Sequence, residues 1–179
     1  TLADPDYPPA LLEAADPPLL LHAWGAPLAR GPLDWPAMVA MVGSRNATPQ
    51  GLANARAFAR HLAGAGWPVV SGLALGIDGA AHEGALEGAL EGASGPAVQA
   101  CATVAVLGTG LDRLYPRQHE GLAARIAGQG LLLSEFALGT PPLQENFPRR
   151  NRIIAGLARG TLVVEAAPQS GSLITARLA

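Results

Sequence analysis

The sequence predicts an α/β fold with a doubly wound, mainly parallel sheet. Two observations lead to this prediction. Five uninterrupted apolar runs occur between residues 37 and 166, and a segment with helical periodicity follows each of them. Apolar strands that alternate with helices are typical of a parallel sheet whose two faces are both covered.

The predicted elements follow the chain in order. Residues 1–36 form a proline-rich lead-in with one apolar run, 19–24, that predicts an edge strand. Residues 37–179 form the α/β domain, which we expect to be incomplete at its C-terminus because the chain stops inside a helical run. Its first helix is predicted over 49–64, where apolar residues recur every three or four positions. Its strands are predicted over 37–42, 67–72, 102–108, 130–135 and 160–166.

A four-residue repeat, EGALEGALEGA, covers residues 83–93. On a helix it places its glutamates on one stripe and its glycines on another. Each glycine inside a helix costs about 1 kcal/mol relative to alanine. We interpret the repeat as a duplication that lengthened a solvated helix. The alternative is a glycine groove that packs closely against a partner helix.

The composition restricts the function classes. The chain has 179 residues and a net charge of −2, and all of its 12 basic residues are arginine. Any nucleic-acid surface must therefore be a local patch. Cys101 is the only cysteine, which excludes a disulfide framework and a cysteine metal cluster. The sequence has no run of about 18 apolar residues and no signal peptide, so we expect a cytoplasmic protein with no membrane contact.

Glycine, serine and arginine gather where the predicted strands end. Gly43, Ser44 and Arg45 follow the first strand, and Gly72 follows the second. The later strands are followed by Gly108, Thr109, Gly110, Tyr115, Ser134, Glu135, Glu165, Gln169, Ser170, Gly171 and Ser172. The carboxyl ends of parallel strands meet at one edge, where open α/β sheets bind ligands. Glycine-rich turns and helix N-termini expose N–H groups, so this edge suits phosphates.

The stretch ENFPRRNRIIAG, 145–156, concentrates positive charge at a predicted helix start. Pro148 suits the first helical position, which makes Phe147 the N-cap residue, and phenylalanine cannot cap. The arginines that follow are Arg149, Arg150 and Arg152. Cations at a helix N-terminus are unfavourable for the fold, so we expect an anion site there. The alternative is ordinary ion pairing with Glu135, Glu145 or Glu165.

Enzymatic signatures are weak in this sequence. It has neither a P-loop nor a dinucleotide fingerprint, and no hydrolase-like nucleophile–base spacing, so we predict no enzyme activity and no cofactor. Asp78 and His82 have the spacing of two metal ligands, but two ligands do not make a site, and we predict Asp78 as a helix N-cap. Glu135 and Glu165 are expected to orient arginines, the alternative being a role as catalytic carboxylates or ribose binders.

Six motifs occur in an order that resembles one family: MVGSRNATPQG, VVSGLALGIDGAAHEGAL, VAVLGTGLDRLYP, LLLSEFALGTPP, FPRRNRIIAGLA and VVEAAPQSGSLITA. Together they closely resemble the DNA-processing protein A family, also called Smf, over nearly the whole chain. The resemblance implies an extended Rossmann-like, DNA-binding domain. It also implies a non-catalytic protein of competence, natural transformation and recombination, which protects incoming single-stranded DNA and loads RecA onto it. The full-length protein is then expected to be a homodimer.

The resemblance assigns a DNA pocket to residues of this chain. It places there Gly43, Ser44, Arg45, Phe147, Arg149, Arg150 and Arg152, with Arg150 and Arg152 partly holding the pocket rather than touching phosphate. The sheet edge adds Gly72, Asn151, Ser170 and Gly171. We expect the Phe147 ring to stack on an unpaired base, the alternative being a ring buried against the sheet.

Two departures from the family pattern affect this assignment. Some relatives have a lysine where this chain has Gln144, and the stretch 88–101 is longer than usual. The rival hypotheses are a Rossmann-like nucleotide-processing enzyme, similar to phosphoribohydrolases, and a protein–protein adaptor. The P-G-G-x-G-T-x-x-E motif of the phosphoribohydrolases is missing.

Overall fold

The computed structural model describes residues 1–31, 35–92, 101–167 and 171–178. Within these residues, six strands form one sheet in the order β1-β5-β4-β3-β2-β6. β1 pairs antiparallel with β5, and all other neighbours are parallel. The strands are β1 (His22–Trp24), β2 (Met38–Val42), β3 (Val69–Ser71), β4 (Thr103–Val106), β5 (Leu131–Ser134) and β6 (Ala158–Val163). The doubly wound α/β prediction is confirmed.

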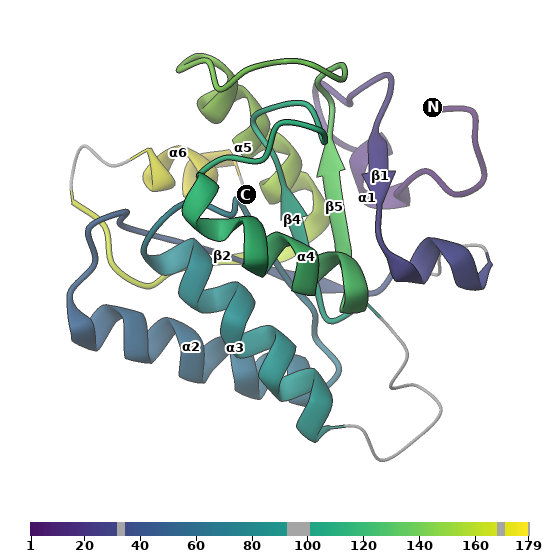
Figure 1. The fold of residues 1–179 in the computed structure, drawn as a ribbon. Coiled ribbons are helices and arrows are strands. Elements are labelled where there is room, and N and C mark those ends of the chain that lie inside the picture. Colours follow the sequence, from purple (N-terminus) through teal and green to yellow (C-terminus); the bar gives the residue numbers. More distant parts are fainter. Residues whose placement is uncertain (32–34, 93–100, 168–170, 179) are drawn as a thin grey trace.

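Helices cover both faces of the sheet (Figure 1). Alternate strand residues point to opposite faces, so Val104 packs against α5 and its neighbour Ala105 against α3 and α4. α2 and α3 share that second face with α4. The helical elements are α1 (Pro9–Leu12), η1 (Ala26–Arg30), α2 (Pro49–Gly64), α3 (Ile77–Glu91), η3 (Arg117–His119), α4 (Glu120–Gln129), α5 (Asn146–Leu157) and α6 (Ser172–Leu178). In the described part, no helix is long and apolar enough to cross a membrane.

The glycines of the four-residue repeat lie against α2. A Cβ on Gly84 would collide with the carbonyl oxygen of Arg56, and one on Gly88 with that of Arg60. Both glycines are buried, so the expectation of a solvated helix is wrong for α3. The alternative, a glycine groove, is confirmed, and its partner is α2 of the same chain.

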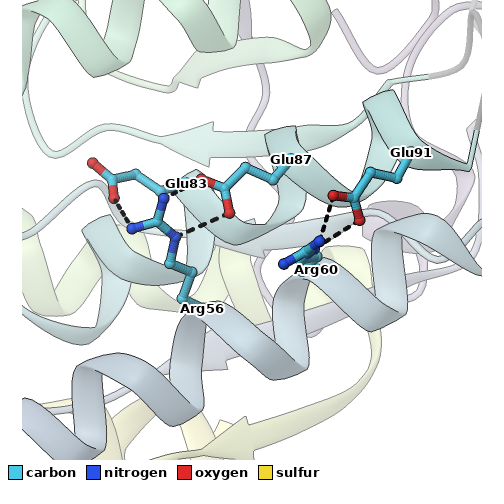
Figure 2. A network of polar contacts seen from close by, with 5 residues as sticks. All are labelled: Arg56, Arg60, Glu83, Glu87 and Glu91. Atoms are coloured by element: carbon cyan, nitrogen blue, oxygen red, sulfur yellow. Dashed lines mark hydrogen bonds and ion pairs between the residues drawn. The ribbon is translucent and has the colours of Figure 1, made fainter.

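The glutamates of the repeat form a row of ion pairs beside this groove (Figure 2). Arg56 Nε donates to Glu87 at 2.9 Å, and Arg56 also lies 3.6 Å from Glu83. One turn further, Arg60 Nε donates to Glu91 at 2.7 Å. These side chains are partly exposed, so they add little stability, but they align the two helices along their length.

Candidate functional site

A cavity of about 790 Å³ opens at the carboxyl edge of the sheet. The loop after β2, the first turn of α5 and the start of α6 surround it. Its polar lining includes Ser44, Arg45, Asn46, Gln144, Arg150 and Asn151. One loop and two helix starts that are far apart in the sequence therefore meet at the edge where the sequence predicts a ligand.

The loop after β2 is fixed on both sides. The Ser44 backbone N–H donates to the carbonyl of Glu165 at 2.6 Å, and the Ser44 carbonyl accepts from Ile77 N–H at 3.1 Å. The neighbouring Gly43 also lines the cavity. These contacts hold Arg45 at the cavity while its side chain remains exposed.

Arg45 and two aromatic rings form one cluster at the cavity. The Arg45 guanidinium lies over the Phe147 ring, 5.4 Å from its centroid. The Tyr115 ring lies 5.6 Å from the same ring, tilted by 41°. A cation held over an aromatic face keeps its charge available, and no carboxylate forms an ion pair with Arg45 among the described residues. Arg45 is therefore a free cation at the mouth of the cavity.

Arg150 is buried beneath the cavity. Its Nη1 donates to the carbonyl oxygens of Gly72, at 2.7 Å, and Val106. Burial lowers the pKa of Arg150 to about 10, against the opposing effect of Asp78, so the guanidinium remains charged at neutral pH. A Cβ on Gly72 would lie 2.5 Å from Arg150 Nη2, which explains the glycine. Arg150 therefore braces the ends of β3 and β4.

The other two arginines of α5 have different surroundings. Arg149 forms a long ion pair with Glu135, at 3.8 Å, and its side chain is 65% exposed; it is not part of the cavity lining, although its neighbours Pro148 and Arg150 are. Arg152 lies outside the cavity lining, with Nε 3.0 Å from Asp16 and Nη2 2.6 Å from Glu135. Ion pairing with Glu135, the alternative considered from the sequence, describes Arg152 and, at a longer distance, Arg149. The expected role of Glu135 in orienting arginines agrees with these contacts.

Three local predictions are wrong: the N-cap of α5, the role of Asp78 and the role of Glu165. α5 begins at Asn146, so Glu145 is its N-cap and Phe147 lies inside the first turn. The expectation that no side chain caps this helix is confirmed. Asp78 is not an N-cap, because α3 starts at Ile77 and the Asp78 carboxylate accepts from the N–H groups of Gly72 and Ala74, at 3.1 and 3.3 Å.

Glu165 does not orient an arginine. Its carboxylate accepts from Thr48 N–H at 3.0 Å and from Thr48 Oγ1 at 2.7 Å. Thr48 caps α2 by accepting from Gly51 N–H at 3.0 Å. Glu165 therefore fixes the start of α2, a contact between residues 117 positions apart that no local pattern indicates.

Two of the remaining predicted residues, Asn151 and Gly171, line the cavity. Asn151 Nδ2 donates to the Gly171 carbonyl at 3.4 Å, and its Oδ1 accepts from Arg150 Nε at 3.2 Å. Ser170 lies outside the described residues. Tyr115 was absent from the predicted DNA-binding set, although an aromatic residue in a loop at the ligand edge was the available signal.

A family model for DNA recombination-mediator protein A matches the chain over residues 1–179. The chain belongs to this family. Protein Smf from Synechocystis is 45% identical over 98% of this chain, which spans 42% of that relative. Because the chain spans less than half of this relative, the activity of the whole protein is a proposal for this chain.

Two solved structures of DNA recombination-mediator protein A relatives have the same fold. DNA processing protein A from Streptococcus pneumoniae matches 99% of this chain and 57% of its own, with 41% identity and a TM-score of 0.82. The Helicobacter pylori protein matches 96% of this chain and 72% of its own, with 32% identity and a TM-score of 0.80. The latter structure was described for its single-stranded DNA binding mode.

Proposed function

We propose that this protein binds single-stranded DNA in the cavity at the carboxyl edge of its sheet, during DNA processing in natural transformation and recombination. The observation that carries the proposal is Arg45, an exposed guanidinium stacked on Phe147 at an open cavity. Membership of the DNA recombination-mediator protein A family supports it, as does the single-stranded DNA binding mode of the Helicobacter pylori relative.

The phosphate backbone is held by charge in this proposal. Arg45, on the loop after β2, and Arg149, in the first turn of α5, have exposed side chains, and that first turn lacks a side-chain cap. Its free N–H groups and helix dipole favour an anion. Arg150 supports the floor of the cavity from within the core, and Arg152 is paired with Asp16 and Glu135. The positive surface is thus a small local patch on a chain whose net charge is −2.

The choice of a single strand follows from the aromatic cluster. Unpaired bases stack on exposed aromatic rings, whereas the bases of a duplex are already paired and stacked. Such stacking is worth about 1–3 kcal/mol per base and depends little on base identity. A cation beside aromatic surface at one cavity therefore suits a single strand of any sequence.

We propose that the protein acts by binding, without catalysis. The carboxylates near the cavity already have partners: Asp78 bonds two backbone N–H groups, Glu165 bonds Thr48, and Glu135 pairs with Arg152. The rival reading, a nucleotide-processing enzyme, requires a carboxylate free to act on substrate. Release of base from nucleotides by the purified protein would favour that rival.

The finer role rests on family resemblance. We propose that the protein protects incoming single-stranded DNA, passes it to RecA, and forms a homodimer in its full-length form in the cytoplasm. A RecA strand-exchange assay on SSB-coated DNA tests this part. The role predicts that the full-length protein shortens the lag before exchange, and an unchanged lag would contradict it.

The DNA-binding proposal is tested by titrating labelled oligo-dT and a duplex of equal length across a salt series. Replacing one phosphate ligand reduces the slope of log K against log salt by about 0.7 for a single strand. We expect Arg45→Ala to weaken binding and to reduce the slope by about this amount.

The matched control is Arg159→Ala. Arg159 is an exposed arginine at the start of β6, at the opposite edge of the sheet from the cavity. We expect it to bind oligo-dT like the unmodified protein. If Arg45→Ala keeps the affinity and slope of the unmodified protein, the cavity is not the DNA site. If no salt-dependent binding occurs at all, the adaptor hypothesis is favoured.

A further inference from the structure

The Phe147 ring, which the sequence suggested as the base-stacking surface, is largely occupied by protein. Arg45 lies over it, 5.4 Å from its centroid, and Tyr115 lies against it at 5.6 Å. Its edge packs on the backbone after β4, where a Cβ on Gly108 would lie only 2.7 Å from Phe147 Cδ1. A base that stacked fully on Phe147 would have to displace Arg45.

The space beneath the Phe147 ring is also too small for a base. A second cavity of about 60 Å³ is enclosed by Phe147, Tyr115, Arg150 and the turn after β3. This space is small beside the 790 Å³ cavity. A nucleotide therefore has to approach from the 790 Å³ cavity.

Tyr115 presents the accessible aromatic surface at that larger cavity. It lines the cavity from the loop between β4 and η3, and the residue is 44% exposed. Phe147 supports one side of its ring, which fixes the ring without covering it. Arg45 contacts the same Phe147, so a cation and an open ring are held by one common support.

The geometry points to Tyr115 as a base-stacking residue of the DNA site, with Phe147 as the support that positions both Tyr115 and Arg45. This inference rests on the proposed function and names the group that meets the base. Because the tyrosine hydroxyl is not part of the stacking surface, Tyr115→Phe should bind like the unmodified protein. Tyr115→Leu should lose the stacking contribution, about 5- to 150-fold in affinity.

The test pairs a ring deletion with a base deletion. Labelled oligo-dT and the same backbone carrying abasic sites are titrated into the purified protein, Tyr115→Leu, Tyr115→Phe and Trp67→Leu. Trp67 is a comparably exposed aromatic, at 42%, outside the cavity lining. We expect the unmodified protein, Tyr115→Phe and Trp67→Leu to prefer oligo-dT by at least about fivefold. Tyr115→Leu should bind both strands equally, with an unchanged salt slope.

The other outcomes separate a failure of this inference from a failure of the proposed function. If Tyr115→Leu still discriminates against the abasic strand as the unmodified protein does, the inference is wrong. It is also wrong if Phe147→Leu, titrated in the same way, removes the discrimination while Tyr115→Leu keeps it, or if the unmodified protein shows no discrimination. In those cases salt-dependent binding lost in Arg45→Ala would leave the proposed function intact. Absence of any salt-dependent binding would overturn both.

Discussion

Arg149, Arg150 and Arg152 lie within four consecutive positions of α5 but have three different environments, because successive helix positions point about 100° apart. Arg149 faces solvent, Arg150 lies in the core under the cavity, and Arg152 pairs with Glu135. A cluster of like charges in the sequence is therefore divided between binding surface, internal brace and ion pair. Among the three, only Arg149 has a mostly exposed side chain that can reach an anion in solvent.

Arg150→Met should strongly destabilise the fold. It leaves the carbonyls of Gly72 and Val106 without their donor and removes the nearest compensating charge from buried Asp78. We expect a loss of about 3 kcal/mol or more in the free energy of unfolding, measured by urea denaturation. The control Arg149→Met should stay within about 0.5 kcal/mol. A loss below about 1 kcal/mol in Arg150→Met would show that Arg150 is not a brace.

His82 should make the stability depend on pH. Burial lowers its pKa to about 3, from 6.5 in the unfolded chain, and its Nδ1 lies 2.8 Å from Thr103 Oγ1. The unfolded state therefore binds a proton below pH 6.5 that the folded state does not, so its stabilising contribution is present above pH 6.5 and is lost as the pH falls towards 3. One proton corresponds to a slope of about 1.4 kcal/mol per pH unit.

Urea denaturation between pH 4 and 6 checks this prediction. His82→Gln should flatten the dependence of unfolding free energy on pH by up to about 1.4 kcal/mol per unit. The exposed His61→Gln on α2 is the control and should leave the slope unchanged. Equal slopes in the two variants would be inconsistent with a neutral buried His82.

At the scale of elements, the α2–α3 pair shows how a sequence of low helix propensity can form a closely packed helix interface. Glycines that would weaken an isolated helix allow the backbones of α2 and α3 to approach closely, and the Arg56 and Arg60 ion pairs run beside the contact. The helix exists because of its partner, so its stability is tertiary rather than intrinsic.

Gly88→Ala should destabilise the protein, because the new Cβ would collide with the Arg60 carbonyl of α2. Overpacking of this kind costs about 1–3 kcal/mol. Gly128→Ala on α4 is the matched control, since no atom lies within 4 Å of its Cβ position. It should be neutral or stabilising by up to about 1 kcal/mol. Thermal and urea denaturation should therefore show a loss of stability in Gly88→Ala and no loss in Gly128→Ala. Similar losses of stability in both variants would disprove the close contact.

At the scale of the whole molecule, the carboxyl edge of the sheet carries the cavity, the aromatic cluster and the exposed Arg45. The apolar runs of the sequence predicted the strands and this edge, because a buried parallel strand has a distinctive local composition. The side-chain partners could not be predicted, since they join distant residues: Arg150 reaches Gly72 across 78 positions, and Thr48 reaches Glu165 across 117. The start of α5 was misplaced because no side-chain cap marks it.

The whole site predicts a preference for single strands. Stacking on an aromatic surface is open only to unpaired bases, so oligo-dT should bind about tenfold or more tightly than a duplex at matched salt. Phe147→Leu, which removes the support of Tyr115 and Arg45, should lose this preference while retaining the fold. Competition titrations and circular dichroism measure the two quantities. Equal affinity of the unmodified protein for both forms would refute the prediction.

An interface that repeats every four residues does not fix its own register. If α3 moved along α2 by about one turn, glycines would again face carbonyls and glutamates would again face arginines. The unique contacts lie at the other end of α3, where Ile77 N–H meets the Ser44 carbonyl and Asp78 holds the turn after β3. The contacts at the cavity end therefore fix the register of α3 against α2. The other end of α3 can vary in length by whole repeats. Deleting residues 84–87, one repeat of the sequence, should lower stability yet leave the affinity for oligo-dT within about twofold. A folded deletion variant that no longer bound DNA would show that the repeat, too, sets the geometry of the site.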